Sequence, residues 1–414
     1  MTSYFRRKLE PLLQTQIDRN QSVLLLGPRQ VGKSTLLKQV ACALRISLVS
    51  PRVRAKYERD PALLADEIRA LPRPPSTASG PETRPVVIID EIQKIPKLMD
   101  VAQEVLDDNL CMMILTGSSA RRLRRGDALN LLPGRVHMMR LDPLLLEEDP
   151  NPTTPHSITE HLHYGALPGV RKLRNAQHAH DLLASYVETY LQEEIREEAL
   201  VRNVALFSRF LELACIEAGQ IVNFTKIASE IGGVSAHTIQ NYYEILEDCL
   251  VAERVDPITK SVTRKKLTKS SRYLIFDLGV RRLGAREGVD ASQERLGQLF
   301  EQWVGLETIR WLRLFARDAR LGFWRDPDGP EVDWVVQRQD SWLPIEVKWT
   351  ERPTLAHIKH LEVFMNEYPQ AREALVVCRC DRPLRLSPRV KAVPWTDLLL
   401  ELKNWRNATS SSTE

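Results

Sequence analysis

Short hydrophobic runs separated by polar segments mark the first third of the chain. Three of them, residues 23–26, 86–89 and 111–115, are uninterrupted, and polar residues follow each one. A strand buried on both faces of a parallel sheet has this uniformly apolar pattern. Residues 36–40, after the first run and a polar loop, begin a helical pattern. We therefore predict an α/β fold with a parallel sheet over residues 1–150.

The hydrophobic spacing changes after residue 150. Leu183, Val187, Leu191 and Ile195 recur at helical intervals, which predicts a helical connector over residues 151–202. No chemistry is evident in this segment.

Residues 203–280 have the pattern of a winged helix-turn-helix. Helices are predicted over residues 206–214, 225–231 and 236–250, with a glycine pair at 232–233 as the turn. Strand-like residues 251–255 and 272–276 flank a basic segment that would form the wing.

Residues 290–405 predict an α+β domain, and residues 406–414 form a polar tail. A helix is expected over 299–304, and strands over 330–336 and 343–349. Every one of the eight tryptophans lies after residue 300, which sets this part of the chain apart.

Composition adds only mild constraints. The 414 residues are 43% hydrophobic and 27% charged, as in ordinary globular proteins, and the net charge of +4 permits nucleic-acid binding without requiring it. The six cysteines form neither a zinc pattern nor a disulfide framework, which favours a reducing cytoplasm. The sequence has neither a secretory signal nor an apolar run of membrane-spanning length, so we expect no membrane partner.

The loop after the first strand has the spacing of a phosphate-binding loop, G-x-x-x-x-G-K-S. Its residues are Gly27, Pro28, Arg29, Gln30, Val31, Gly32, Lys33, Ser34 and Thr35. Glycines let backbone N–H groups wrap a phosphate, and the following helix N-terminus adds positive potential. Lys33 would reach the terminal phosphates and the Ser34 hydroxyl would bind Mg²⁺. The alternative is a chance glycine loop between two buried elements.

Asp90 and Glu91 end the second hydrophobic run, where open α/β sheets bind ligands. We expect Asp90 to hold Mg²⁺ and Glu91 to polarise the attacking water in phosphoryl transfer. Acidic residues at the end of a strand are a weak signal alone, but together with the phosphate-binding loop they become a strong one.

The third predicted helix and the wing are candidate DNA contacts. The residues at the groove end of the helix are Ser235, His237, Thr238 and Asn241, and those of the wing are Arg264, Lys265, Lys266 and Lys269. Glu244, Glu247 and Asp248 lie further along the helix and would repel phosphates. A protein-binding winged helix is therefore the alternative interpretation.

Acidic and basic residues also cluster in the C-terminal domain. Asp333 precedes Glu346 and Lys348 across a predicted hairpin, and Glu301 lies on the preceding helix. Alternation puts Asp333 on one face of its strand, and Val332 and Trp334 on the other. Asp333, Glu346 and Glu301 could bind Mg²⁺, and Lys348 could orient water for phosphodiester cleavage. The alternatives are an exposed charge pair, or a retained fold without catalysis.

The motifs G-P-R-Q-V-G-K-S-T, I-I-D-E-I-Q-K-I-P, L-T-G-S-S, L-P-G-R, Y-L-I-F-D-L-G, E-V-D-W and I-E-V-K occur in this order. Together they resemble a family of bacterial and archaeal AAA+ ATPases with a P-loop module, a central winged helix and a C-terminal PD-(D/E)XK nuclease-like domain of unknown function. The similarity runs nearly end to end. One departure is Ser34-Thr35, where many relatives have two threonines, and either hydroxyl can bind magnesium.

The resemblance implies a three-layer P-loop AAA+ domain, ATP hydrolysis and DNA association. It implies that a polar residue after the third run senses the γ-phosphate; Ser118 is our choice over Thr116 and Ser119. Gln93 would contact water or couple the site to DNA. It also implies a homo-oligomer such as a hexameric ring, in which an arginine reaches the neighbour's nucleotide. The candidates for this arginine are Arg121, Arg122, Arg124, Arg125 and our choice, Arg135.

We therefore predict an ATP-hydrolysing, Mg²⁺-dependent, DNA-processing protein whose C-terminal domain binds or cuts DNA. Two alternatives remain: a DNA motor with an inert nuclease-like domain, and a nucleotide-switched protein scaffold.

Overall fold

The computed structural model describes residues 4–72, 84–118, 134–149, 157–191, 203–259, 269–326 and 329–410. Within these ranges the chain forms two compact units. The first holds the described residues up to Pro143 together with Glu244–Val251, and the second holds the others.

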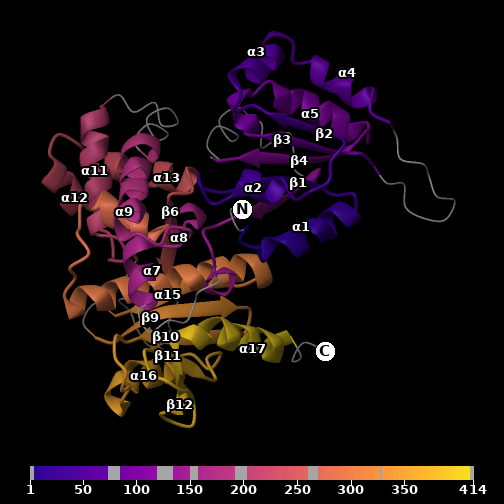
Figure 1. The fold of residues 1–414 in the computed structure, drawn as a ribbon. Coiled ribbons are helices and arrows are strands. Elements are labelled where there is room, and N and C mark those ends of the chain that lie inside the picture. The colour runs from indigo at the N-terminus through magenta and orange to yellow at the C-terminus, as the bar shows by residue number, and fades with distance from the viewer. Residues whose placement is uncertain are drawn as a thin grey trace. The chain divides into compact units, whose positions relative to one another are not determined.

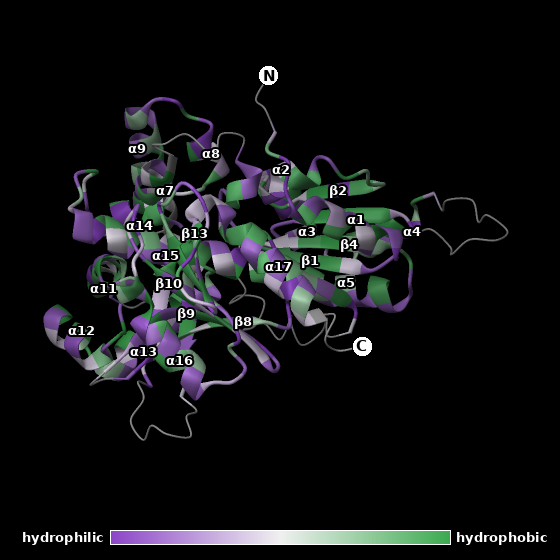
Figure 2. Ribbon diagram, turned by 90° about the horizontal axis from the view of Figure 1, so that it is seen from below, coloured by the Kyte–Doolittle hydropathy of each residue, from purple (hydrophilic) through white to green (hydrophobic). Residues whose placement is uncertain are grey.

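A parallel sheet of five strands is the centre of the first unit, as the hydrophobic runs predict. Its order is β2-β3-β4-β1-β5. The strands are β1 (Ser22–Leu26), β2 (Leu44–Ser47), β3 (Val86–Asp90), β4 (Met112–Gly117) and β5 (Val136–Arg140). The side chains of β1, and those of β3 and β4 except Val86, are almost fully buried, which accounts for their lack of alternation. Figure 2 shows the corresponding hydrophobic colour on β1 and β4.

Helices cover both faces of this sheet, so the unit has three layers. Helices α3, α4 and α5 lie on one side in Figure 1, and α1 and α2 on the other. Their bounds are α1 (Leu9–Asp18), α2 (Lys33–Leu37), α3 (Pro51–Arg59), α4 (Leu63–Arg69) and α5 (Leu98–Asp107). The predicted α/β fold with a parallel sheet is thus confirmed.

The second unit begins with helices, as predicted from the spacing after residue 150. These are α7 (Ser157–Tyr164), α8 (Pro168–Arg171), α9 (Ala176–Ser185), a π-helical turn (Tyr186–Leu191), α11 (Val204–Ile216), α12 (Phe224–Ile231) and α13 (Ala236–Asp248), of which the residues from Glu244 onward fall in the first unit. Gly232 and Gly233 connect α12 to α13 with φ of 74° and 69°, values that glycine adopts without steric cost. On α11, Phe210 packs against Tyr242 and Tyr243 of α13, with ring centroids 5.2 and 5.0 Å apart.

An eight-stranded mixed sheet forms the rest of this unit, in the order β12-β13-β11-β10-β9-β8-β6-β7. The strands are β6 (Ala252–Pro257), β7 (Arg272–Ile275), β8 (Arg320–Arg325), β9 (Glu331–Arg338), β10 (Ser341–Val347), β11 (Ala374–Cys378), β12 (Leu384–Arg385) and β13 (Val390–Pro394). The accompanying helices are α14 (Leu278–Gly284), α15 (Gln293–Phe315), α16 (Lys359–Glu367) and α17 (Leu398–Ser410).

The ribbon expected as a wing is continuous with the C-terminal sheet. Strand β6 pairs with β7 in antiparallel and with β8 in parallel orientation, where Asp256 faces Gly322. Backbone hydrogen bonds therefore link the ribbon to β8 and, through it, to the β9–β10 hairpin.

The simple alternation expected for β9 is wrong. Val332 packs in the cluster that includes Phe364 of α16, whereas Trp334 belongs to the cluster that includes Trp303 of α15. A shift in the β8–β9 register between Gly322 and Trp324 interrupts the regular pleat at this point.

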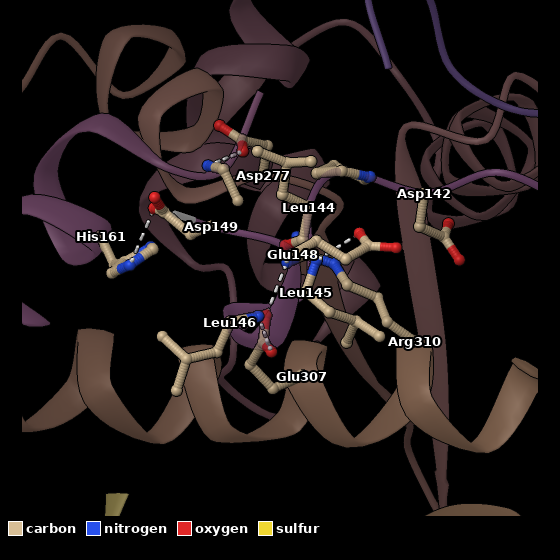
Figure 3. Close-up of polar contacts among 12 residues, drawn as sticks. Asp142, Leu144, Leu145, Leu146, Glu148, Asp149, His161, Asp277, Glu307 and Arg310 are labelled. Atoms are coloured by element: carbon tan, nitrogen blue, oxygen red, sulfur yellow. Dashed lines mark hydrogen bonds and ion pairs between the residues drawn. The ribbon is translucent and has the colours of Figure 1, made fainter. Parts of the chain in front are cut away.

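Buried polar side chains anchor the segment that starts the second unit (Figure 3). Glu307 Oε2 accepts a hydrogen bond from the Leu146 N–H at 3.0 Å. Arg310 donates to Glu307 at 2.9 Å, to the Leu144 carbonyl at 3.3 Å and to the Phe276 carbonyl at 2.8 Å. Burial raises the pKa of Glu307 to about 7 despite this ion pair. Helix α15 thus fixes two other segments of the unit through a pair of buried charges.

Replacing Arg310 by methionine should destabilise the second unit. Glu307 is 1% exposed and would lose its charge partner, and breaking a buried pair from one side costs about 3–5 kcal/mol. Thermal unfolding should show a clearly lower melting temperature. The control is Arg69→Ala, which removes an exposed ion pair with Glu104 and should cost at most about 1 kcal/mol. Equal melting temperatures for both variants would contradict the structural role of Arg310.

Candidate functional site

The loop between β1 and α2 has a backbone that depends on its glycines. Gly32 has φ of 100°, in the left-handed region, and the Leu36 N–H donates to its carbonyl to start α2. A Cβ on Gly27 would lie 2.3 Å from the Leu141 carbonyl oxygen. Both positions therefore exclude larger side chains, as the predicted phosphate-binding loop requires.

Lys33 is buried against this loop. Its Nζ donates to the carbonyls of Gly27 at 2.7 Å and Pro28 at 3.1 Å, and lies 3.9 Å from Glu91 Oε1. The ammonium group is therefore inside the loop and next to the carboxylate at the end of β3.

Asp90 joins the loop to two neighbouring strands. Its Oδ2 accepts a hydrogen bond from Ser34 Oγ at 2.9 Å, and its Oδ1 accepts one from Thr116 Oγ1 at 2.6 Å. Thr116 Oγ1 also accepts from the Glu91 N–H at 2.9 Å. The structure thus brings Ser34, Asp90 and Thr116 together, as the shared edge of a parallel sheet predicts.

Glu91 is held in an unusual backbone conformation by polar neighbours. Its φ of 61° lies in the left-handed region, which is uncommon for a residue with a side chain. Glu91 Oε2 accepts hydrogen bonds from Gln93 Nε2 and from Ser118 Oγ, the latter at 3.0 Å. Gln93 Nε2 also donates to Ser118 Oγ at 3.1 Å. Sequence reasoning assigned Ser118 to sensing, and the contact to Glu91 was not predicted.

The candidate arginine of the first unit is engaged within its own chain. Arg135 forms a two-point ion pair with Asp107, at 2.5 and 3.2 Å. Ser119 and the other candidate arginines, Arg121, Arg122, Arg124 and Arg125, lie outside the described residues.

The C-terminal acids predicted from spacing meet in the second unit. Asp333 on β9 accepts from the Val347 N–H at 2.8 Å, and Lys348 forms an ion pair with Glu346 at 2.6 Å. Glu346 is 4% exposed, and its Oε2 has no hydrogen-bond partner among the described residues. Glu301 of α15 is part of the same electrostatic cluster.

The electrostatics of this cluster reflect burial. Loss of water and the charge of Asp333 raise the pKa of Glu346 to about 8 and that of Glu301 to about 7. Burial also raises the pKa of Asp333. Burial alone would lower the pKa of Lys348, but the charges of Asp333 and Glu346 raise it. Carboxylates whose pKa values are raised in this way are typical of functional sites.

Sequence reasoning missed Arg272, at the start of β7. Its Nη1 lies 2.6 Å from Glu301 Oε1 and 3.4 Å from the Asp333 carbonyl. The only sequence signal was a basic residue at the beginning of a hydrophobic strand, which is common at exposed strand ends.

The candidate DNA contacts differ in their surroundings. Ser235 Oγ accepts from the Thr238 N–H at 3.1 Å and so caps α13, leaving His237 and Asn241 exposed on its first turns. Lys269 is exposed before β7, and Arg264, Lys265 and Lys266 lie outside the described residues. Glu244 is exposed further along α13.

Two properties of the described residues bear on partners. No helix among them is long and apolar enough to cross a membrane. In the same part of the chain, no group of three or more His, Cys, Asp or Glu side chains is arranged to hold a metal ion.

Among solved structures, the chain is similar to the Orc1 protein of Aeropyrum pernix in complex with DNA, with 12% identity and a TM-score of 0.28 over 69% of this chain and 94% of that one. It is also similar to the replication initiator DnaA bound to AMPPCP and single-stranded DNA, with 10% identity and a TM-score of 0.30 over 57% of this chain and 86% of that one.

The chain is also similar to uncharacterized proteins of Mycobacterium tuberculosis and Mycobacterium bovis. Each is 26% identical over 399 residues, which cover 95% of this chain and 84% of the relative. Family models match three successive segments: an AAA domain at residues 19–149, a domain of unknown function (DUF8612) at 155–291 and a second domain of unknown function (DUF4143) at 296–398. The chain therefore combines an AAA domain with the α/β fold of P-loop ATPases and two further domains whose functions are not known.

Proposed function

We propose that this chain is an ATPase that acts on DNA. The observation that carries the proposal is the 2.9 Å hydrogen bond between Ser34 Oγ and Asp90 Oδ2. It joins the glycine-rich loop to the acidic end of β3, and these are the two halves that phosphoryl transfer requires. The AAA domain match over residues 19–149 covers both halves.

The loop would hold the phosphates of ATP through the backbone N–H groups of residues 27–35 and the start of α2. Lys33 Nζ, which now donates to the loop carbonyls of Gly27 and Pro28, would move to the terminal phosphates. This exchange replaces neutral acceptors by anionic ones, which form stronger hydrogen bonds with an ammonium group.

The donor set around Asp90 fits Mg²⁺, which prefers oxygen ligands and usually takes one or two carboxylates plus substrate phosphates. Ser34 Oγ and an Asp90 carboxylate oxygen would hold it, and Thr116 would keep the carboxylate oriented. A bound Mg²⁺ would neutralise charge that develops on the phosphates.

Glu91 would polarise the attacking water. In the present arrangement its Oε2 is occupied by Gln93 and Ser118. Ser118 would report the presence of the γ-phosphate by exchanging this contact, and Arg135 would leave Asp107 to reach a neighbouring subunit in a homo-oligomer, such as a hexameric ring.

We place DNA contact on α13 and the ribbon, through Ser235, His237, Thr238, Asn241 and Lys269 together with the basic residues 264–266. The exposure of His237, Asn241 and Lys269 supports this assignment. The exposed Glu244 limits it to the first turns of the helix, because phosphates would be repelled further along. We likewise propose four domains. They are an ATPase domain at 1–150, a helical connector at 151–202, a winged helix at 203–280 and a nuclease-like domain at 290–405.

The purified full chain should hydrolyse ATP, and two substitutions should separate binding from chemistry. Lys33→Ala should lose nucleotide affinity, because it removes the cation at the terminal phosphates. Glu91→Gln should bind ATP but turn over about 10²–10⁴-fold more slowly, the usual contribution of a general base. Nucleotide affinity and phosphate release are the measurements. Lys38→Ala, which changes an exposed lysine just after α2, is the control.

Unchanged affinity in Lys33→Ala, or wild-type turnover in Glu91→Gln, would contradict these roles. The same assay with added DNA tests the partner. Stimulated turnover and retention of DNA at low salt support DNA processing. Turnover that DNA leaves unchanged, without retention at low salt, would instead indicate a nucleotide-switched scaffold.

A second candidate function, Mg²⁺-dependent DNA cleavage, is favoured by one observation. Glu346 Oε2 is buried without a partner among the described residues, next to Asp333 and Lys348, so an acceptor is available for a cation. Asp333 and Glu346 would hold the ion and Lys348 would stabilise charge on the scissile phosphate.

Labelled single-stranded, double-stranded and branched DNA should be cut in the presence of Mg²⁺ or Mn²⁺, and Asp333→Ala and Lys348→Ala should each abolish the cleavage. Lys403→Ala, at an exposed position of α17, is the control for loss of positive charge. If the wild type does not cut, or if both variants cut equally well, the C-terminal domain is inert as a nuclease and the motor interpretation is favoured.

A further inference from the structure

Arg272 places a positive charge beside the C-terminal carboxylates. It lies on the ribbon strand β7, is 5% exposed, and its guanidinium carbon is 4.5 Å from the centre of the Phe323 ring. The centre of the Trp334 ring lies 5.4 Å from the same guanidinium carbon. Aromatic rings on a planar guanidinium fix its orientation and exclude water from it.

Glu301 is the residue that this cation holds. Arg272 Nη1 is 2.6 Å from Glu301 Oε1, and Trp334 Nε1 donates to the Glu301 carbonyl at 3.0 Å. Both the side chain and the backbone of Glu301 are therefore fixed. A carboxylate in a short contact with arginine is a poor ligand for a cation, because the two positive charges compete for it.

Asp333 and Glu346 are placed differently. Lys348 contacts Glu346 Oε1 and leaves Oε2 without a partner among the described residues. Asp333 uses its Oδ2 for the Val347 N–H. The three carboxylates and two cations of this cluster sum to a charge of −1. One divalent ion would bring this sum to +1 and a second would bring it to +3, an excess of positive charge that is costly to bury.

We propose that Arg272 keeps Glu301 from serving as a metal ligand, so that the cluster takes a single divalent cation on Asp333 and Glu346. The inference rests on the second candidate function and adds the number of ions and the residue that limits it.

Binding of Mn²⁺ to the nucleotide-free full chain tests the proposal, with the free ion measured by electron paramagnetic resonance. Every chain carries Ser34→Ala, which removes the loop's metal ligand. We expect one Mn²⁺ per chain. Glu346→Gln should weaken binding by more than about 10-fold, because loss of even an outer partner of a ligand can cost that much. The chemically identical change Glu301→Gln should cost clearly less.

Removing the guanidinium should have the opposite effect. Arg272→Gln frees Glu301, so we expect a second Mn²⁺ per chain or binding at least about 10-fold tighter, in a variant whose circular dichroism matches the wild type. If this variant does not fold, the two glutamate variants decide the question alone.

Three results would overturn the inference. Equal losses in Glu301→Gln and Glu346→Gln would make Glu301 a ligand, which removes the role of Arg272 but keeps the metal site. A folded Arg272→Gln chain that binds Mn²⁺ with the number of ions and the affinity of the wild type would also remove the role of Arg272 and keep the metal site. A chain that binds no Mn²⁺ in any form would end both the inference and the second candidate function.

Discussion

The parallel pairing of β1, β3 and β4 is the constraint on which the candidate nucleotide site depends. Parallel strands end at the same edge of a sheet, so the loop after β1, the acids of β3 and the polar end of β4 must meet. Asp90 makes this meeting specific, because its two oxygens take one hydroxyl from Ser34 and one from Thr116. Without this register, the same residues would be unrelated loop positions.

Buried charge is arranged differently in the second unit. Helix α15 carries Glu301, Glu307 and Arg310, and each is tied to a different strand or segment of the unit. Desolvation of such groups is costly, and each has a partner of opposite sign: Arg272 for the half-buried Glu301, and Glu307 and Arg310 for each other. The helix therefore connects the carboxylate cluster to residues 144–146, with which the second unit begins.

The strands and the glycine-rich loop could be predicted from the sequence because their signals are local. A short, uniformly hydrophobic run such as residues 86–89, bounded by polar residues, is typical of a buried strand, and the loop spacing is specific. Arg272 could not be found in this way, since its partner Glu301 is known only once the fold brings β7 next to α15. The family resemblance singled out Gln93, but its contact with Ser118 depends on the pairing of β3 with β4. The pairing of β6 with β8 is likewise a long-range choice, and the shift in the β8–β9 register places Val332 and Trp334 on different faces.

The continuity of the eight-stranded sheet has a mechanical consequence. Strand β6 shares backbone hydrogen bonds with β7 and with β8, so the ribbon has no hinge of its own on that side. A load applied to the ribbon would spread through the hydrogen-bond ladder and deform the pleat around Asp333 instead of swinging a separate arm.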